Sequence, residues 1–215
     1  MNLSFSYHTA KDVENFLKAS KSINNPKPTK LQNLYREKFG EKLEAAKVRE
    51  FIEGYVKENN IDIGKRVEAI KTDWLLIEQN FVKRAEGIFG IHYPKETIEV
   101  FLTTNSRCAY NIDGNYFFVN IQSENANAII MHELFHFYTW HAFHKELEQK
   151  GLSKQQYNDI KESLTEILNI EFTDLMKGAE DKGYSQHQDL RKKIREIWQK
   201  SKNIRALVND LVSTQ

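Results

Sequence analysis

Residues 128–143 read AIIMHELFHFYTWHAF, and this stretch decides how the whole chain is interpreted. It is largely apolar and holds no glycine or proline, so it predicts a helix that is buried on most sides. Ser123 suits the N-cap of this helix and Gly151 its C-terminal end, which gives a helix from about residue 124 to 149. Polar side chains inside such a helix need a reason to be there, because an unpaired buried polar group is costly.

The polar residues are two histidines with a glutamate between them. His132 and His136 are four residues apart, so their imidazoles project from nearly the same helix face. Zinc accepts neutral imidazole nitrogen and prefers tetrahedral ligands. Glu133 is then placed to take a proton from zinc-bound water and to return it to a leaving amine. The segment therefore predicts one Zn²⁺ ion and a catalytic base, although a short motif also arises by chance.

A third ligand must come from elsewhere. The longer pattern HExxHxxGxxH would need glycine at 139 and histidine at 142, where this chain has Thr139 and Ala142. His141 and His144 lie on the same predicted helix but on a different face from the motif. The long helix by itself therefore supplies two ligands.

The next predicted helix offers glutamates. It opens with Ser153 and Gln156 in capping-box spacing and carries Glu162 and Glu166 four residues apart, so the two glutamates share a face. Two helices joined by a short connection lie antiparallel, which would bring a glutamate beside the histidines. Taken alone, however, such a glutamate pair is typical of a solvated helix face.

With these residues the chain resembles the gluzincins, the thermolysin-like zinc metallopeptidases, in a small form. The resemblance covers residues 97–176. It implies that Glu162 is the third zinc ligand and that Glu166 hydrogen-bonds a zinc-bound histidine. It also implies that Glu133 assists zinc-bound water in hydrolysing a peptide bond of a peptide or protein substrate.

The resemblance leaves one catalytic role open. Members of the family stabilise the oxyanion with a tyrosine or a histidine, and here the candidates are Tyr184, His187 and Tyr157. It also implies that a strand before the active-site helix binds extended substrate, with residues 116–121 or 109–111 supplying the edge.

The rest of the sequence predicts an α+β fold that is mostly helical. The chain has 9 glycines and 3 prolines, a scarcity that favours long helices. We expect an N-terminal helical region over residues 1–93 and a zincin-like core over residues 94–215, packed as one compact unit. Within them we expect a helix from Thr9 through Ser20, a linker at 24–28 and a helix over 65–88. A strand at 97–103 and a hairpin around Asp113-Gly114 complete a small sheet with antiparallel pairing.

Composition narrows the class of protein. The 31 basic and 30 acidic residues nearly cancel, which argues against a nucleic-acid partner. The single cysteine, Cys108, excludes an internal disulfide and fits a reducing compartment. No signal peptide or membrane span is evident, so we expect a cytoplasmic protein. Nothing in the sequence indicates the oligomeric state.

Two other interpretations remain open. In a deformylase-like hydrolase Cys108 would join the two histidines, but the residues around it lack the glycine and leucine context of that family. In a catalytically inert or latent zincin-like protein the site would serve binding or regulation. The short region after Gly178 favours this second interpretation, whereas Glu133 argues against it, since a structural zinc site needs no base.

Overall fold

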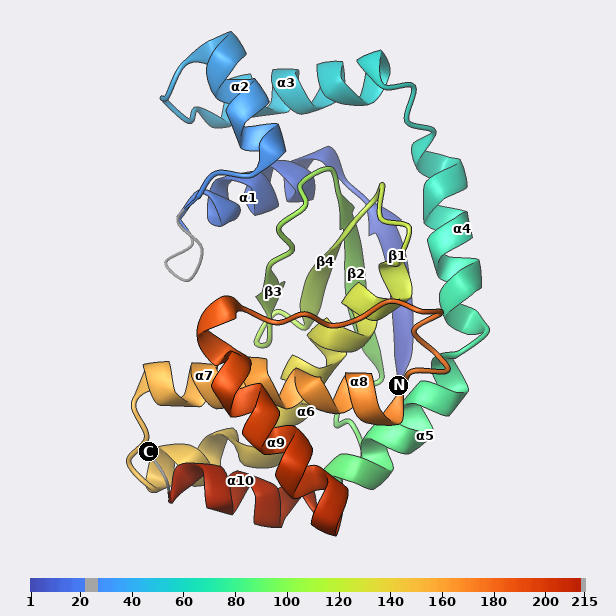
Figure 1. Cartoon of the computed structure of the whole chain (residues 1–215). Coiled ribbons are helices and arrows are strands. Elements are labelled where there is room, and N and C mark those ends of the chain that lie inside the picture. The colour runs from blue at the N-terminus through green and yellow to red at the C-terminus, as the bar shows by residue number, and fades with distance from the viewer. Residues whose placement is uncertain (22–26, 214–215) are drawn as a thin grey trace. The chain divides into compact units, whose positions relative to one another are not determined.

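The computed structural model describes residues 1–21 and 27–213 (Figure 1). The fold is α+β and mostly helical, as the sequence predicts, with a small four-stranded mixed sheet. Residues 24–26 of the expected linker lie outside the described residues. Within the described ranges, no helix combines the length and the apolar character needed to cross a bilayer.

The sheet has the strand order β1-β2-β4-β3, with β1 at Asn2–Tyr7, β2 at Thr97–Thr103, β3 at Tyr110–Asn111 and β4 at Tyr116–Asn120. Strands β1 and β4 both run parallel to β2, and β3 pairs antiparallel with β4. The expected strand at 97–103 and the hairpin that follows it are therefore confirmed. Strand β3 forms one edge of the sheet, and β4 lies inside it.

Strand β1 was not expected, because the first ninety residues were interpreted as helical. In this segment Leu3, Phe5 and Tyr7 alternate with small polar residues, which is the period of a strand. Leu3 pairs with Ile98 and Phe5 with Val100 of β2.

The chain forms two compact units, each built from separate stretches. The first unit comprises residues 1–74 and 96–126, and the second comprises residues 75–95 and 127–215. This grouping differs from the single boundary expected between residues 93 and 94. The N-terminal strand shares a sheet with residues 97–120, whereas residues 78–89 belong with the second unit.

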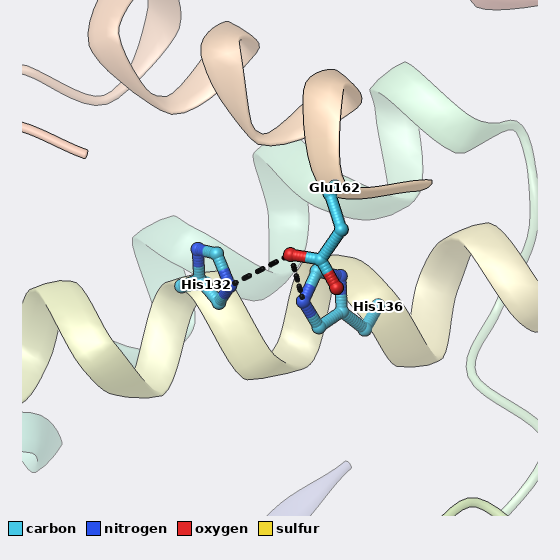
Figure 2. Close-up of side chains that lie close together, drawn as sticks. All are labelled: His132, His136 and Glu162. Atoms are coloured by element: carbon cyan, nitrogen blue, oxygen red, sulfur yellow. Dashed lines mark ion pairs between the residues drawn. The ribbon is translucent and has the colours of Figure 1, made fainter. Parts of the chain in front are cut away.

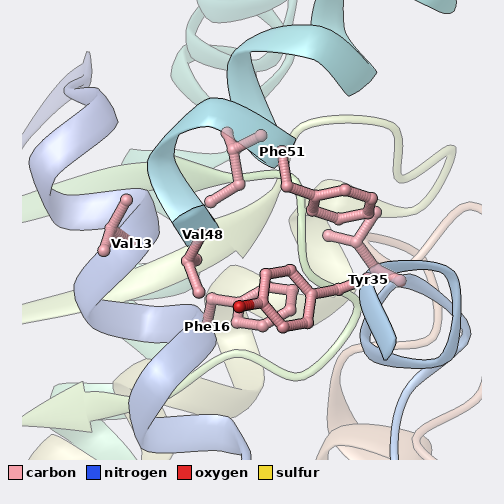
Figure 3. Packing of buried hydrophobic residues seen from close by; sticks show 7 residues of the cluster. Val13, Phe16, Tyr35, Val48 and Phe51 are labelled. Atoms are coloured by element: carbon pink, nitrogen blue, oxygen red, sulfur yellow. The ribbon is translucent and has the colours of Figure 1, made fainter. Parts of the chain in front are cut away.

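The first unit contains the sheet and helices α1 (Thr9–Ala19), α2 (Lys30–Phe39), α3 (Ala45–Glu58) and most of α4 (Ile63–Leu75). Figure 3 shows how α1, α2 and α3 bury an aromatic-rich core around Phe16, Tyr35 and Phe51. The rings of these three residues pack with centroids 5.5 to 6.2 Å apart. Helix α1 begins at Thr9 as expected, and the Asp12 carboxylate in its first turn accepts a hydrogen bond from Thr103 of β2.

The second unit is helical. It holds α5 (Glu78–Phe89), α6 (Ala126–Gln149, from its second residue onward), α7 (Lys154–Leu164), the 3₁₀ turn η1 (Thr165–Ile167), α8 (Leu168–Glu171), the 3₁₀ turn η2 (Ser185–His187), α9 (Gln188–Ser201) and α10 (Ile204–Val212). Phe135 and Tyr138 of α6 are fully buried against rings from α5. The apolar side of the motif helix is therefore core, as its composition predicts.

Two local predictions are wrong. The helix expected over 65–88 is two helices, α4 and α5, which are separated at Leu76 and Ile77 although no glycine or proline marks the break. The spacing of Ser185 and Gln188 also predicts a capping box, which is absent, because the Gln188 amide donates to the carbonyls of Lys182 and Tyr184. The capping box at Ser153 and Gln156 is confirmed.

Candidate metal centre

Helix α6 presents two imidazoles on one face. The ring centroids of His132 and His136 lie 4.4 Å apart, one turn from each other on a continuous helix. His136 is buried, whereas 24% of the His132 side chain is exposed. The histidine pair is therefore reached by solvent from the His132 side.

Helix α7 brings Glu162 to this pair. Gly151, with φ +80°, follows α6, and the capping box at Ser153 then starts α7, so the chain turns back within a few residues. Glu162 Oε2 lies 3.5 Å from His136 Nε2 and 3.8 Å from His132 Nε2 (Figure 2). One ligand atom from each of the three residues falls within 4.8 Å of the other two.

These three donors fit zinc. Bonds of about 2.0–2.2 Å put neighbouring ligand atoms of a tetrahedral ion roughly 3.3–3.5 Å apart, close to the separations of Glu162 from the imidazoles. Two imidazole nitrogens and one carboxylate oxygen also form a donor set of catalytic zinc sites, in which the fourth position is open. Magnesium and calcium would call for an oxygen-rich set instead.

Asp181 orients one of the histidines. Its Oδ2 atom lies 2.5 Å from His132 Nδ1, the ring nitrogen that faces away from Glu162. A carboxylate in this position accepts the Nδ1 hydrogen and leaves the lone pair of Nε2 for a metal. Asp181 was not predicted from the sequence, because it lies in an irregular segment between α8 and η2 where no periodicity indicates a residue near the metal ligands.

Three side chains hold Asp181 in place. The Asn169 side chain forms hydrogen bonds with both the backbone N–H and the carbonyl of Asp181, at 2.9 and 2.8 Å. Thr165 Oγ1 donates to Asp181 Oδ1 at 3.1 Å, and the Arg191 guanidinium lies 3.1 Å from the same oxygen. The irregular segment is thus fixed by η1, α8 and α9.

Glu166 was expected to contact a zinc-bound histidine, and the structure places it elsewhere. Its carboxylate pairs with Arg191 at 2.8 Å and with Arg195, and it accepts a hydrogen bond from Asn169. It lies in the turn η1, where the helix tightens just after Glu162. Glu166 therefore belongs to the outer network that surrounds Asp181, and Asp181 is the carboxylate at the histidine.

Glu133 is buried beside the donors. Only 5% of its surface is exposed, and its Oε2 atom has no hydrogen-bond partner among the described residues. Burial raises its pKa to about 7, against an opposing effect of His132. A carboxylate with such a pKa exchanges protons readily near neutral pH, as a general base must.

The two histidines have opposite environments. Burial lowers the pKa of His136 to about 3, with Lys161 adding to the effect, so this ring is neutral and able to ligate. Burial also acts to lower the pKa of His132, but the charge and hydrogen bond of Asp181 outweigh it and raise the pKa to about 9. For Glu162, burial is outweighed by His136 and Lys161, and its pKa is lowered.

The candidates for oxyanion stabilisation lie around α7 and η2. His187 is buried and its Nε2 lies 2.9 Å from Asp159 Oδ1, while the Tyr184 ring packs edge-on against the His187 ring. Tyr157 packs against the ring of His144, which stacks on Trp140. The structure thus brings His132, Glu133, His136 and Glu162 together, and it shows His187 engaged with Asp159.

Comparison with models of protein families, with curated proteins and with solved structures gives no match for this chain. The function of this chain must therefore be inferred from the chemistry of the site itself.

Proposed function

We propose that this chain is a zinc-dependent metallopeptidase of the gluzincin type that hydrolyses peptide bonds. The observation that carries the proposal is the convergence of His132 Nε2, His136 Nε2 and Glu162 Oε2 beside the buried carboxylate of Glu133. The sequence motif alone can also arise by chance. A third donor that comes from a separate helix and a carboxylate on His132 Nδ1 make coincidence a poor explanation.

In this proposal each residue has a defined task. His132, His136 and Glu162 hold the ion, and Asp181 keeps His132 in the tautomer that offers Nε2. Zinc, when bound, supplies a Lewis acid that polarises a carbonyl and lowers the pKa of water. Glu133 takes the proton of the attacking water on its unpartnered Oε2 and then donates it to the nitrogen of the leaving amine. A peptide substrate would approach from the exposed His132 side.

Metal content is the first test. We expect about one zinc per chain, as for a single tetrahedral site, in wild-type protein purified without added metal, and a sharp loss in Glu162→Ala. Glu148→Ala, an exposed glutamate on α6, is the matched control and should keep its zinc. Wild-type protein that takes up no zinc even after reconstitution would overturn the proposal.

Glu133→Gln separates binding from catalysis. The amide has nearly the same shape but cannot accept the proton, so the variant should keep zinc and lose hydrolysis of a peptide library by roughly 10²- to 10⁴-fold. Elemental analysis and peptide cleavage followed by mass spectrometry measure the two effects. Undiminished cleavage by a clean Glu133→Gln preparation would exclude this role.

A catalytically inert or latent zincin-like protein is the second candidate. The observation that favours it is the engagement of His187 Nε2 with Asp159, which occupies one of the two ring nitrogens of a residue expected to stabilise the oxyanion. Zinc binding by the wild type without cleavage of any library peptide would support it. In both cases Cys108→Ser should leave metal binding intact, whereas a deformylase-like site would lose its ion.

A further inference from the structure

A lysine is buried at the metal centre. Only 3% of the Lys161 side chain is exposed, and its Nζ lies 2.6 Å from Oε1 of Glu162. Neighbouring residues on a helix point about 100° apart and do not normally face each other. The Lys161 side chain must therefore bend along α7 to reach the carboxylate. Burying an ammonium in this way is costly unless it is paired.

The two oxygens of Glu162 have different partners. Oε1 accepts the hydrogen bond from the Lys161 ammonium, and Oε2 lies 3.5 and 3.8 Å from the two imidazole nitrogens (Figure 2). A free carboxylate can ligate a cation through one oxygen or through both. An ammonium held at Oε1 competes for that oxygen, and a charge-assisted hydrogen bond of this kind is a strong one.

We infer that Lys161 is a positioning residue of the metal centre, which holds Oε1 so that Glu162 offers the ion a single oxygen, Oε2. The inference rests on the proposed function only in that the site takes a metal. With one oxygen from Glu162 and one nitrogen from each histidine, three positions of a tetrahedral ion are filled and one stays open for water. Without Lys161, Oε1 is free to ligate as well, and the number of ligands rises.

Cobalt(II) reports this difference directly. Four-coordinate Co²⁺ has intense visible absorption, which weakens when a fifth ligand joins, so the spectrum counts ligands in a way that a loss of stability does not mimic. We expect the wild-type protein loaded with Co²⁺ to give the four-coordinate spectrum. Lys161→Met, which fills a similar volume without the ammonium, should lose visible intensity per bound Co²⁺ ion. The matched control is Lys150→Met, which removes a more exposed lysine that pairs with Glu146 on α6, and it should keep the wild-type spectrum.

The outcomes separate the two proposals. If wild-type protein binds neither Zn²⁺ nor Co²⁺, the proposed function and this inference both fail. If it binds Co²⁺ but Lys161→Met gives an unchanged spectrum, the inference alone fails. Should Lys161→Met not fold, the wild type still decides: a five-coordinate Co²⁺ spectrum, or a zinc-bound crystal structure in which both oxygens of Glu162 ligate, would overturn the inference. A crystal structure with only Oε2 on zinc and Lys161 Nζ on Oε1 would support it.

Discussion

The hydrogen bond between Asp181 and His132 gives the candidate centre its most specific contact at the scale of single residues. Asp181 Oδ2 lies 2.5 Å from the ring nitrogen that does not face Glu162, and both Asn169 and Thr165 support it. Carboxylates in this position fix the ring orientation and raise the basicity of the ligating nitrogen. A substitution that weakens this hydrogen bond therefore tests whether His132 ligates through Nε2.

Asp181→Asn should weaken zinc binding roughly 10- to 100-fold, because the neutral amide accepts the Nδ1 hydrogen less strongly. Competition with a chelating indicator measures the affinity. Asp174→Asn serves as the control, since Asp174 is an exposed aspartate of the same unit that pairs with Arg84. Equal zinc affinities of the wild type and Asp181→Asn would mean that His132 does not ligate through Nε2 with its hydrogen on Nδ1.

The proximity of the three candidate donors was predictable from the sequence because helix geometry is local. The spacing of His132 and His136 fixes a common face, and the short connection after Gly151 makes a return of the next helix to that face predictable. Asp181 could not be predicted from the sequence, because its position depends on contacts with three separate segments rather than on a period in the sequence. For the same reason Glu166, which has the right spacing for the face of Glu162, was assigned to a histidine but lies with two arginines.

At the scale of elements, helix α9 supplies an arginine that binds the carboxylates of Glu166 and Asp181 next to the candidate metal centre. Arg191 is 3% exposed and its guanidinium contacts Glu166 Oε2, Asp181 Oδ1 and Thr165 Oγ1. Arg191 is the cation that these two buried carboxylates share, while Glu166 also pairs with Arg195 and Asp181 with His132. Removing one partner of a buried ion pair leaves an uncompensated charge.

Arg191→Met should therefore lower the free energy of unfolding by about 3–5 kcal/mol, as for other broken buried pairs. Urea denaturation followed by circular dichroism measures it. Lys192→Met removes the adjacent, exposed charge of the same helix and should change stability by less than about 0.5 kcal/mol. A loss of similar size in both variants would show that α9 matters only through its overall charge.

Helix α1 is joined to strand β2 through a buried carboxylate. Asp12 is fully buried and accepts hydrogen bonds from Thr103 Oγ1 at 2.5 Å, from the backbone N–H of Thr104 at 3.0 Å and from Tyr7 Oη at 3.2 Å. Burial raises the pKa of Asp12 above its ordinary value of 3.8, even though these hydrogen bonds act to lower it. The folded state therefore holds this proton more tightly than the unfolded state does.

The contribution of Asp12 to the free energy of unfolding should therefore change with pH in one direction. The stability that the protonated carboxyl contributes is fully present below the ordinary pKa and is lost as the pH rises through the raised one. The unfolding free energy of the wild type minus that of Asp12→Asn should thus decrease as the pH rises above about 4, measured by urea denaturation at each pH. Asp113→Asn, at the exposed hairpin turn, controls for the substitution. A difference that increases with pH would show that the carboxylate form is the stabilising one.

Helices and strands were predictable where a hydrophobic period or characteristic turn residues mark them along the sequence. Strand β2, the hairpin and helix α6 have clear periods or turn residues, and each was expected within a few positions. Strand β1 also has the period of a strand, but it is only six residues long and precedes a long helical region. The break between α4 and α5 has no local signal, because apolar helix-forming residues run through it.

At the scale of the whole molecule, local sequence patterns do not predict which distant segments of the chain pair with one another. Strand β1 pairs with β2 some ninety residues further along the chain, and the parallel register of this pair depends on the complete sheet. The chain passes between its two units three times, at residues 74/75, 95/96 and 126/127. Each unit nevertheless has its own buried core, around Phe16 and Tyr35 in the first and around Phe135 in the second.

Because all three proposed metal donors belong to the second unit, zinc should stabilise that unit in preference to the first. A ligand that binds only the folded state adds RT ln(1 + [L]/Kd), or about 2.7 kcal/mol when free zinc is 100 times its Kd. Hydrogen exchange followed by mass spectrometry resolves the two units in one experiment. We expect amides of α6 and α7 that exchange by unfolding of their unit to slow by about 100-fold, and those of α1, α2 and α3 to change little.

The Glu162→Ala variant distinguishes the possible outcomes of that experiment. In the variant, zinc should leave exchange unchanged in both units, because one of the three donors is missing. Equal protection of both units in the wild type would show that they unfold as a single cooperative block despite their separate cores. Protection of α1–α3 alone would place the metal outside His132, His136 and Glu162. Only selective slowing in the second unit, abolished by Glu162→Ala, agrees with a metal centre built by α6 and α7.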